Sequence, residues 1–547
     1  MPILPWIAIG VIWGSEGQPS DTAKVATQVQ EMLRVGRHPT LRWPNLGDVR
    51  AVADSAYRRA GWRPLWIENG RPTAEALAII AAVGTVADRG LVPADFDTDS
   101  LTAGAKRLAR TSTNQFDQAR FDLALTTAVV RLASTLHEGR LDPQTIIPGW
   151  RAGPDRLDVL ATVDMLRRSA EPTRVFDGLE PQSQEYRKLK QWLARYRALV
   201  PTQGPPLPLP RASLRPGGGY RAAGQLRLTL RAVGDLGPGA SALTSPDSIY
   251  DDALAAAVRR FQRRHGLVDD GVIGRATLAQ LNEPYQRRVR QIELALERRR
   301  WWPDSARTPP IIVNVPAFRL TAMDRNPVRD STIEMRIIAG VAKKDETPVF
   351  TAELGRVVFQ PFWEVPTSIM RQEIRPKALR DPAYLEREGM DLLVGEQVVP
   401  PTSQNVRRIG QGVRVRQRPG PKNALGRVKF LLTSGYAIHL HDTPAPSLFG
   451  AARRDFSHGC IRISDPPTLA RFVLSTLPGW TNQRIEAALA ADTSIAVSLP
   501  EPISVAVVYE TVVLSGNEIE FRPDLYGRDR VFERLLARGY PYRKRIS

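Results

Sequence analysis

Residues 436 to 466 read YAIHLHDTPAPSLFGAARRDFSHGCIRISDP. Apolar residues alternate with polar ones at both ends of this stretch, which predicts two strands, Tyr436 to His441 and Cys460 to Ser464. A glycine-containing loop leads into the second strand. The stretch therefore predicts β structure that places His441 at the end of one strand and Cys460 at the start of another.

Cys460 is the chain's single cysteine, which excludes an intrachain disulfide and makes a chemical role for the thiol more plausible in an exported protein. A thiol attacks as the thiolate, so it needs a nearby base or positive charge. Backbone N–H groups at Gly459 and Cys460 would form an oxyanion hole, because glycine has no Cβ to block close approach. The groups available to activate the thiol are His441, His458, Arg454 and Arg462.

His441, fifteen further residues and then Ser457-His458-Gly459-Cys460 match the H-x(14–17)-[ST]-H-G-C signature of YkuD-type L,D-transpeptidases. Three other stretches resemble the long YcbB-like subclass of that family: Gln360 to Pro366, Asn423 to Phe430 and Leu440 to Pro444. That subclass carries a helical scaffold, a peptidoglycan-binding module and a capping insertion in its catalytic domain. The resemblance extends over nearly the whole chain.

The resemblance implies an acyl transfer in two steps. Cys460 forms a thioester with a peptidoglycan tetrapeptide stem, and an amine of a neighbouring stem resolves it. It also implies that His441 is the base, oriented by the Asp442 carbonyl, that Gly459 belongs to the oxyanion loop, and that His458 shapes the pocket. The expected ligands are peptidoglycan stem peptides and carbapenem inhibitors, with no cofactor and no metal. As substrate contacts we expect Ser457, Arg462, Arg454 and Trp363, where Arg462 replaces the family's usual Asn and Trp363 is a pocket wall or core residue.

Three alternatives remain open at this point. Water instead of an amine would resolve the same thioester, which gives an L,D-carboxypeptidase. A wall-binding scaffold with an inert catalytic domain would need no chemistry. A zinc peptidase would take ligands from His439, His441, His458 and Cys460.

The chain has 547 residues, which is more than one hydrophobic core usually organises, so we expect a multidomain α+β protein. Helical periodicity before residue 200, a Pro/Gly-rich stretch after it and β-branched runs beyond residue 310 mark the divisions. The expected parts are a signal peptide or anchor at 1–20, a helical scaffold at 21–199, a linker at 200–219, a peptidoglycan-binding domain at 220–284, a connecting helix at 285–304, and a β-rich catalytic domain at 305–547 with a cap insertion at about 367–420.

Two of these parts depend on local patterns. Leu254, Val258 and Phe261 share one helical face, and the order of the FQ, HGL, DGVIG and LN elements resembles the three-helix peptidoglycan-binding domain type 1. A bundle that keeps this core without binding any ligand is the alternative. In the cap insertion, Ser368 to Ile374 and Ala383 to Glu388 look helical, and the Pro- and Gly-rich remainder predicts a mobile loop over the catalytic groove.

A net charge of +19 makes a polyanionic partner plausible. The arginines are scattered, and no nucleic-acid module is recognisable, so we expect no nucleic acid and favour an anionic wall or membrane surface. The apolar run Ile3 to Trp13, followed by small residues, resembles a signal peptide or short anchor. The expected location is the periplasm or cell envelope after export, with membrane proximity through the N-terminus.

Overall fold

The structure is a computed structural model that describes residues 21–110, 114–147, 150, 153–210, 212–237, 248–302, 309–324, 332–381 and 383–540. The signal peptide or anchor expected at residues 1–20 lies outside the described residues. The chain divides into two compact units, one of residues 1–137, 156–180 and 538–547, the other of residues 138–155 and 181–537. None of the described helices has the length and apolar character needed to cross a membrane.

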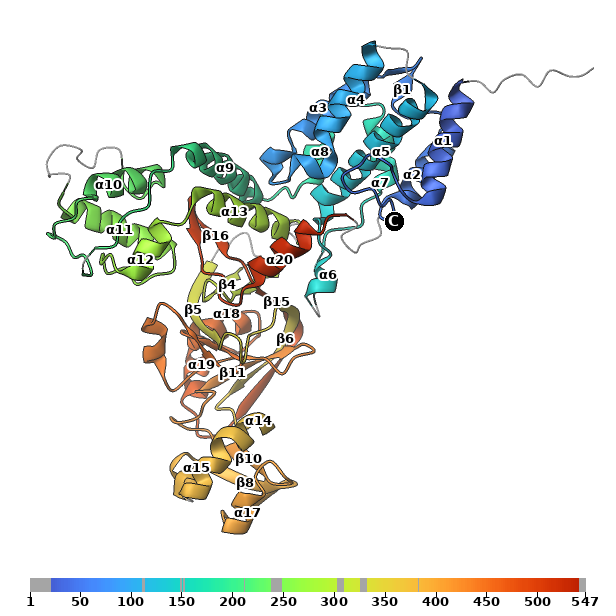
Figure 1. Ribbon diagram of the computed structural model, residues 1–547. Coiled ribbons are helices and arrows are strands. Elements are labelled where there is room, and N and C mark those ends of the chain that lie inside the picture. The colour runs from blue at the N-terminus through green and yellow to red at the C-terminus, as the bar shows by residue number, and fades with distance from the viewer. Residues whose placement is uncertain are drawn as a thin grey trace, which may run out of the picture. The chain divides into compact units, whose positions relative to one another are not determined.

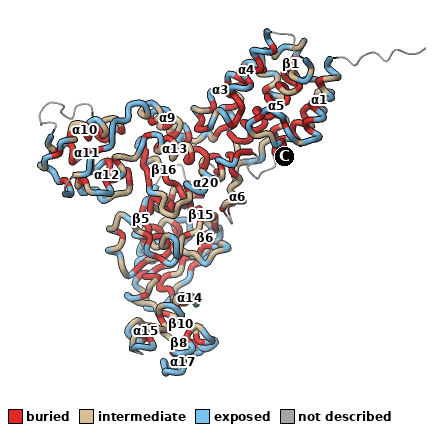
Figure 2. Tube along the Cα trace, in the orientation of Figure 1, coloured by how far each residue is buried: buried red, intermediate tan, exposed pale blue. Residues whose placement is uncertain are grey.

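The first unit is helical, as predicted for the N-terminal part of the chain (Figure 1). Its long central helix is buried along most of its length (Figure 2), and the carboxylate of Asp122 accepts hydrogen bonds from the Tyr57 hydroxyl at 2.6 Å and the Trp66 amide at 2.8 Å. The elements are α1 (Asp21–Val35), α2 (Arg50–Arg59), β1 (Ile67–Glu68), β2 (Arg71–Pro72), α3 (Ala74–Gly84), η1 (Val86–Arg89), η2 (Pro93–Phe96), α4 (Thr98–Arg110), α5 (Gln115–Glu138), α7 (Val159–Leu166) and α8 (Pro172–Leu179).

The second unit begins with helices, including those of the expected peptidoglycan-binding module. Leu254, Val258 and Phe261 are buried in one core, as their helical spacing predicts, and Asp251 caps the N-terminus of their helix by accepting from the Leu254 amide at 2.8 Å. The elements are α6 (Pro143–Ile146), α9 (Gln184–Leu199), η3 (Val200–Thr202), α10 (Ala223–Ala232), α11 (Asp252–Arg264), α12 (Arg275–Leu281) and α13 (Tyr285–Arg299).

Helix α9 lies within residues 21–199, the range expected for the scaffold. Tyr186, Leu189, Leu193 and Tyr196 of α9 join the hydrophobic core that also contains α10, α11 and α13, so α9 belongs to the second compact unit. The stated limits of the parts remain predictions.

A nine-stranded sheet forms the β-rich part of the described chain, in the order β13-β5-β14-β12-β11-β6-β15-β3-β4 (Figure 1). Strand β4, at one end of this order, also pairs with β5 near the other end, so the sheet closes on itself. The strands are β3 (Ile311–Asn314), β4 (Arg319–Met323), β5 (Thr332–Gly340), β6 (Phe350–Phe359), β11 (Val428–Thr433), β12 (Leu440–His441), β13 (Asp455–Ser457), β14 (Ile461–Ile463) and β15 (Ile495–Val508).

The remaining elements of this domain follow the sheet in the chain. Asp465 caps one helix by accepting from the Thr468 amide at 3.1 Å, as its position before Pro466 predicts. These elements are η6 (Pro446–Gly450), α18 (Pro466–Leu474), α19 (Asn482–Leu489), β16 (Val512–Ser515), β17 (Glu518–Phe521) and α20 (Arg528–Ala537).

Strand lengths differ from the prediction around the motif. Strand β12 covers only Leu440–His441, because residues 434–437 bend and the Ser434 hydroxyl donates to the Tyr436 carbonyl. The long strand β15 is continuous along the chain, but its pairing with β6 shifts register between Ser498 and Ile503.

The cap insertion is a folded subdomain, and the prediction of a loop-rich second half is wrong, whereas its mobility over the catalytic groove remains a prediction. Its strands form a four-stranded sheet in the order β7-β10-β8-β9, and its apolar residues, among them Met370, Leu392 and Val415, bury a core of their own. Gly410 and Gly412 have φ of 75° and 91° and make a turn before β10, where the sequence suggested loop. The elements are β7 (Trp363–Glu364), α14 (Thr367–Ile369), η5 (Met370–Ile374), α15 (Arg375–Arg380), α16 (Ala383–Arg387), β8 (Met390–Val394), β9 (Gln397–Val399), α17 (Ser403–Arg407) and β10 (Arg414–Gln417).

Candidate active site

Three polar residues lie side by side at the centre of the nine-stranded sheet. Lys429 of β11 is the register partner of His441 of β12, and His441 is the register partner of Arg462 of β14. Register partners on neighbouring strands point to the same face of a sheet. The structure therefore brings together two motif residues, His441 and Arg462, with Lys429, which sequence reasoning did not select although it interrupts an apolar strand.

Cys460 immediately precedes β14 and is partly exposed. Its Sγ lies 3.7 Å from the Ala437 carbonyl oxygen. Burial raises the pKa of the Cys460 thiol, while the backbone at His439 and the charges of Lys429 and Arg462 act in the opposite direction. The thiol is thus held protonated at neutral pH, beside two cations that favour the thiolate once the proton leaves.

His441 is only 4% exposed, and its Nδ1 lies 2.6 Å from the Asp442 carbonyl oxygen. A carbonyl oxygen only accepts, so the neutral ring carries its proton on Nδ1, and Nε2 keeps a free lone pair. Burial, followed by the charge of Arg462, lowers the pKa of His441 to about 3, although the Asp442 carbonyl opposes this shift. The imidazole is therefore a neutral acceptor in the resting site.

Gly459 occupies the loop before Cys460 with a φ of 103°, which favours glycine. A Cβ at this position would lie 3.2 Å from Ile438 Cδ1. The Gly459 amide donates to Ser457 Oγ at 3.2 Å, and the Ser457 hydroxyl donates to the Cys460 carbonyl at 2.5 Å. Ser457 is 2% exposed and braces this loop, and its role as a substrate contact remains a prediction.

The same hydrogen bonds bear on the expected oxyanion hole. The Gly459 amide is already donating, whereas the Cys460 N–H has no acceptor among the described residues and is the N–H of the thiol's own residue.

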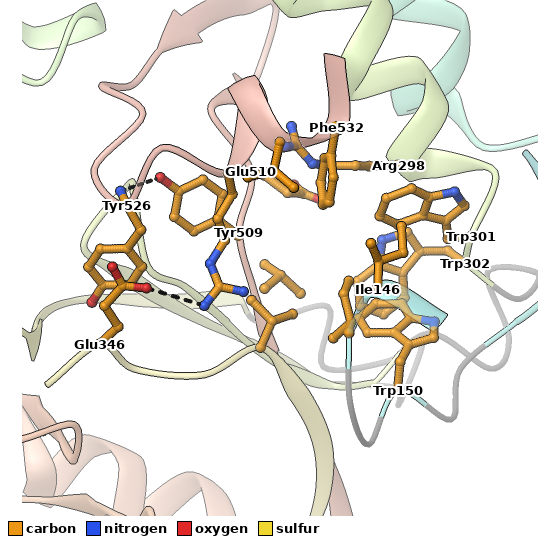
Figure 3. A pocket seen from close by; sticks show the side chains of 15 residues that line it. Ile146, Trp150, Arg298, Trp301, Trp302, Glu346, Tyr509, Glu510, Tyr526 and Phe532 are labelled. Carbon is orange, nitrogen blue, oxygen red and sulfur yellow. Dashed lines mark hydrogen bonds and ion pairs between the residues drawn. The ribbon is translucent and has the colours of Figure 1, made fainter. Parts of the chain in front are cut away.

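Thr347 supports this loop, Tyr526 in turn supports Thr347, and sequence reasoning missed both. The Thr347 hydroxyl donates to the Gly459 carbonyl at 2.8 Å, and the Tyr526 hydroxyl accepts from the Thr347 amide at 3.3 Å and donates to the Gly340 carbonyl of β5 at 2.7 Å. Figure 3 shows Tyr526 on the wall of a cavity of about 270 Å³ that three tryptophans, Trp150, Trp301 and Trp302, also line. Neither supporting residue lies near the motif in the chain, so no local signal marks them.

His458 points to the cap instead of the sheet. Its Nε2 lies 2.7 Å from Oε1 of Glu373 in η5, and the side chains of His458 and Glu373 are 41% and 38% exposed. The cap therefore contacts the residue two positions before Cys460. Sequence reasoning missed Glu373, because nothing local distinguishes it from any exposed helical glutamate.

The other expected substrate contacts fall in different places. Trp363 starts the cap sheet in β7 and packs beside the cap core. The Arg454 guanidinium donates to the carbonyls of Ile337, Ala451 and Phe318, and it lines a separate cavity of about 690 Å³ that Cys460 does not line. Of the predicted arginines, only Arg462 stands in the row beside the thiol, and its buried Nε has no hydrogen-bond partner among the described residues.

Within the described ranges, no three His, Cys, Asp or Glu side chains are grouped as ligands of a metal ion would be. The zinc-peptidase alternative therefore has no ligand set in that part of the chain.

Three family models match this chain, in the order expected for the long subclass. Residues 51–193 match a model described as "Scaffold domain", residues 223–281 one described as "Putative peptidoglycan binding domain", and residues 309–491 one described as "L,D-transpeptidase catalytic domain". A curated protein of Haemophilus influenzae named "Putative L,D-transpeptidase" is 33% identical over 223 residues. The match covers 40% of this chain and 44% of that relative.

Proposed function

From an L,D-transpeptidase catalytic domain that follows a scaffold domain and a peptidoglycan-binding domain, we infer that this chain joins peptidoglycan stem peptides through a thioester on Cys460. The observation that carries the proposal is the row of Lys429, His441 and Arg462 beside the cysteine. It supplies a proton acceptor and two cations to a single nucleophile.

In the first step, Cys460 Sγ attacks the carbonyl carbon of the third residue of a tetrapeptide stem. The thiol proton moves to Nε2 of His441 as the S–C bond forms, because the resting pair is neutral on both sides. The C–N bond to the terminal D-alanine then breaks, and the proton on His441 passes to the departing amine. A thioester and free D-alanine result.

In the second step, an amine of a neighbouring stem attacks the thioester carbonyl. His441 Nε2 accepts the amine proton and returns it to the departing sulfur, so the thiol is restored and a new amide joins the two stems. The Cys460 N–H stabilises the oxyanion of both tetrahedral intermediates. Water in place of the amine gives a shortened stem, which is the carboxypeptidase outcome.

The proposed site of action is the periplasm, because both the peptidoglycan-binding and the catalytic domains act on a polymer outside the cytoplasm. Carbapenems are the proposed inhibitors, since an acylating lactam would occupy the same thiol.

Incubating the full chain with purified sacculi tests the proposal. Mass spectrometry of the digested wall should reveal new dimers joined between the third residues of two stems, together with released D-alanine. If D-alanine is released and shortened stems appear without dimers, the activity is hydrolysis and not transpeptidation. If neither dimers nor D-alanine appear, both activities are excluded.

A further inference from the structure

The cavity of about 690 Å³ that Arg454 lines lies between the peptidoglycan-binding module and the catalytic sheet, and we call it the arginine groove. Its volume falls in the range of ligand pockets. Four segments contribute to its wall: the α11–α12 connection, the β3–β4 turn with the facing part of β5, residues 450–454, and the chain after β17. Its lining arginines are Arg263, Arg319, Arg336, Arg453, Arg454 and Arg522.

Carboxylates pair with four of these arginines and leave two without an ion pair among the described residues. Glu520 pairs with Arg319 at 2.9 Å and with Arg522 at 2.5 Å, Glu334 pairs with Arg319 at 3.6 Å, Asp269 pairs with Arg263 at 3.3 Å, and Asp455 pairs with Arg453 at 2.6 Å. The guanidinium of Arg336 donates only to the Phe449 carbonyl, at 3.3 Å. Neither Arg336 nor Arg454 has a carboxylate at ion-pair distance within the described residues.

Two features show that the cations are crowded. Arg319 and Arg336 are direct cross-strand partners on β4 and β5, an arrangement in which like charges destabilise a strand pair. Burial, and then the charges of Arg336, Arg522 and Arg319, lower the pKa of Arg454 to about 10. An anion between these side chains would relieve the repulsion.

A buried donor in the wall also lacks a partner. Arg522 is 9% exposed, and its Nε makes no hydrogen bond to any described residue, although Nη1 and Nη2 are bonded to the Arg263 carbonyl and Glu520. Planar guanidinium groups bind carboxylates through paired N–H donors. Because the Arg522 Nε is itself buried, a ligand in the groove would meet the uncompensated charge of Arg336 and Arg454 and not this atom.

We propose that the arginine groove binds a carboxylate-bearing peptide, and that this peptide is a stem of a neighbouring peptidoglycan strand. The inference rests on the proposed function for the identity of the peptide, because stems carry free carboxylates. It adds a site, distinct from the one around Cys460, that holds a second strand against the catalytic domain. The position beside the α11–α12 connection lets the peptidoglycan-binding module and the groove engage the same strand.

The test measures peptide binding after the catalytic site has been filled. The full chain is acylated on Cys460 with a carbapenem, the adduct is verified by mass, and a fluorescent tetrapeptide stem is titrated by anisotropy. Binding should persist in the acylated chain. Arg336→Gln should weaken it at least about fivefold, because one charge-assisted contact is lost, and Arg336→Lys should restore part of it. Arg356→Gln is the matched control, since Arg356 is an exposed strand arginine that bonds Ser498 outside the groove.

Two competitors identify the ligand chemistry. The same tetrapeptide with amidated carboxylates should bind at least about tenfold more weakly, and inorganic phosphate should not displace the labelled peptide at millimolar concentration. Loss of all binding upon acylation, equal binding of the amidated peptide, or displacement by phosphate would each overturn the proposal. If the carbapenem fails to acylate the chain, the proposed function is in question. The same titration is then carried out in Cys460→Ala, with and without Arg336→Gln, and it shows separately whether the arginine groove binds the peptide.

Discussion

Oε1 of Glu373 and Nε2 of His458 lie 2.7 Å apart, and this contact links the cap to the catalytic motif. Glu373 sits in η5, a π-helical turn of the cap, and His458 stands two residues before Cys460. Short π-helical segments are frequent at functional sites. The rest of the cap has its own core, so this contact attaches a folded subdomain, and not an isolated loop, to the motif.

Glu373→Gln should loosen the cap without unfolding it. A partly exposed polar contact of this kind contributes about 0–1 kcal/mol, so the population in which the cap contacts the motif should fall by up to roughly fivefold. A thioester that is less shielded from water should then be hydrolysed more often. The measurement is the ratio of shortened stems to dimers, with Glu386→Gln as the control, because Glu386 is a cap glutamate that pairs with Arg418 instead.

An unchanged product ratio in Glu373→Gln would mean that this contact does not control access of water. Point substitution is the appropriate probe here. Shortening residues 401–420 would remove α17 and the central strand β10 and so destroy the cap fold.

Cys460→Ala should abolish dimer formation and carbapenem adducts while leaving the fold intact. The side chain is small and partly exposed, so its loss should shift the thermal midpoint by no more than about 3 °C. Turnover should fall by on the order of 10³-fold or more, because the nucleophile is removed. Turnover near that of the unaltered chain would refute the cysteine mechanism.

His441→Ala should slow acylation far more than His458→Ala. The first substitution removes the proton acceptor whose Nδ1 is fixed by the Asp442 carbonyl, and we expect a loss of about 10²–10⁴-fold. The second removes a partly exposed residue paired with the cap, and we expect less than about tenfold. The rate of carbapenem acylation distinguishes the two variants, and equal losses would contradict the assignment of the base.

Lys429→Met should shift the pH profile of Cys460 towards higher pH. Burial already raises the pKa of the thiol above its ordinary value of 9.0, and the charge of Lys429 opposes that shift. The thiolate fraction therefore grows with pH, so the rate of alkylation by iodoacetamide should rise from pH 6 to 9 without a plateau. Losing the cation should reduce this rate about three- to tenfold at pH 8, which corresponds to roughly 0.5–1 unit of pKa.

Lys429→Arg keeps a cation at this position and should restore most of the rate. If Lys429→Met and the unaltered chain show the same pH profile, Lys429 does not stabilise the thiolate and serves the packing of β11 alone.

Local sequence patterns predicted much of the fold and part of the candidate site. The helices of the peptidoglycan-binding module follow from apolar residues such as Leu254, Val258 and Phe261 on one face, and the cap of α18 follows from Asp465 before Pro466. The loop of the motif is contiguous in the chain, so Gly459 and Cys460 were identifiable without a structure. The strands of the cap were not identifiable from the sequence, because short strands separated by glycine-containing turns lack a clear periodic pattern.

Tertiary structure alone decided which side chains surround the thiol. Lys429 stands beside His441 because of the register between β11 and β12, and register is a property of strand pairing that no local periodicity encodes. The contacts from Thr347 to Gly459 and from Glu373 to His458 join segments far apart in the chain. Arg454 is close to Cys460 in the sequence and was expected to contact the substrate. In the structure its guanidinium donates to three backbone carbonyls and lines the arginine groove. The sequence by itself thus determined the single cysteine and its loop, whereas long-range pairing determined which charged and ionisable side chains surround the thiol of this proposed nucleophile.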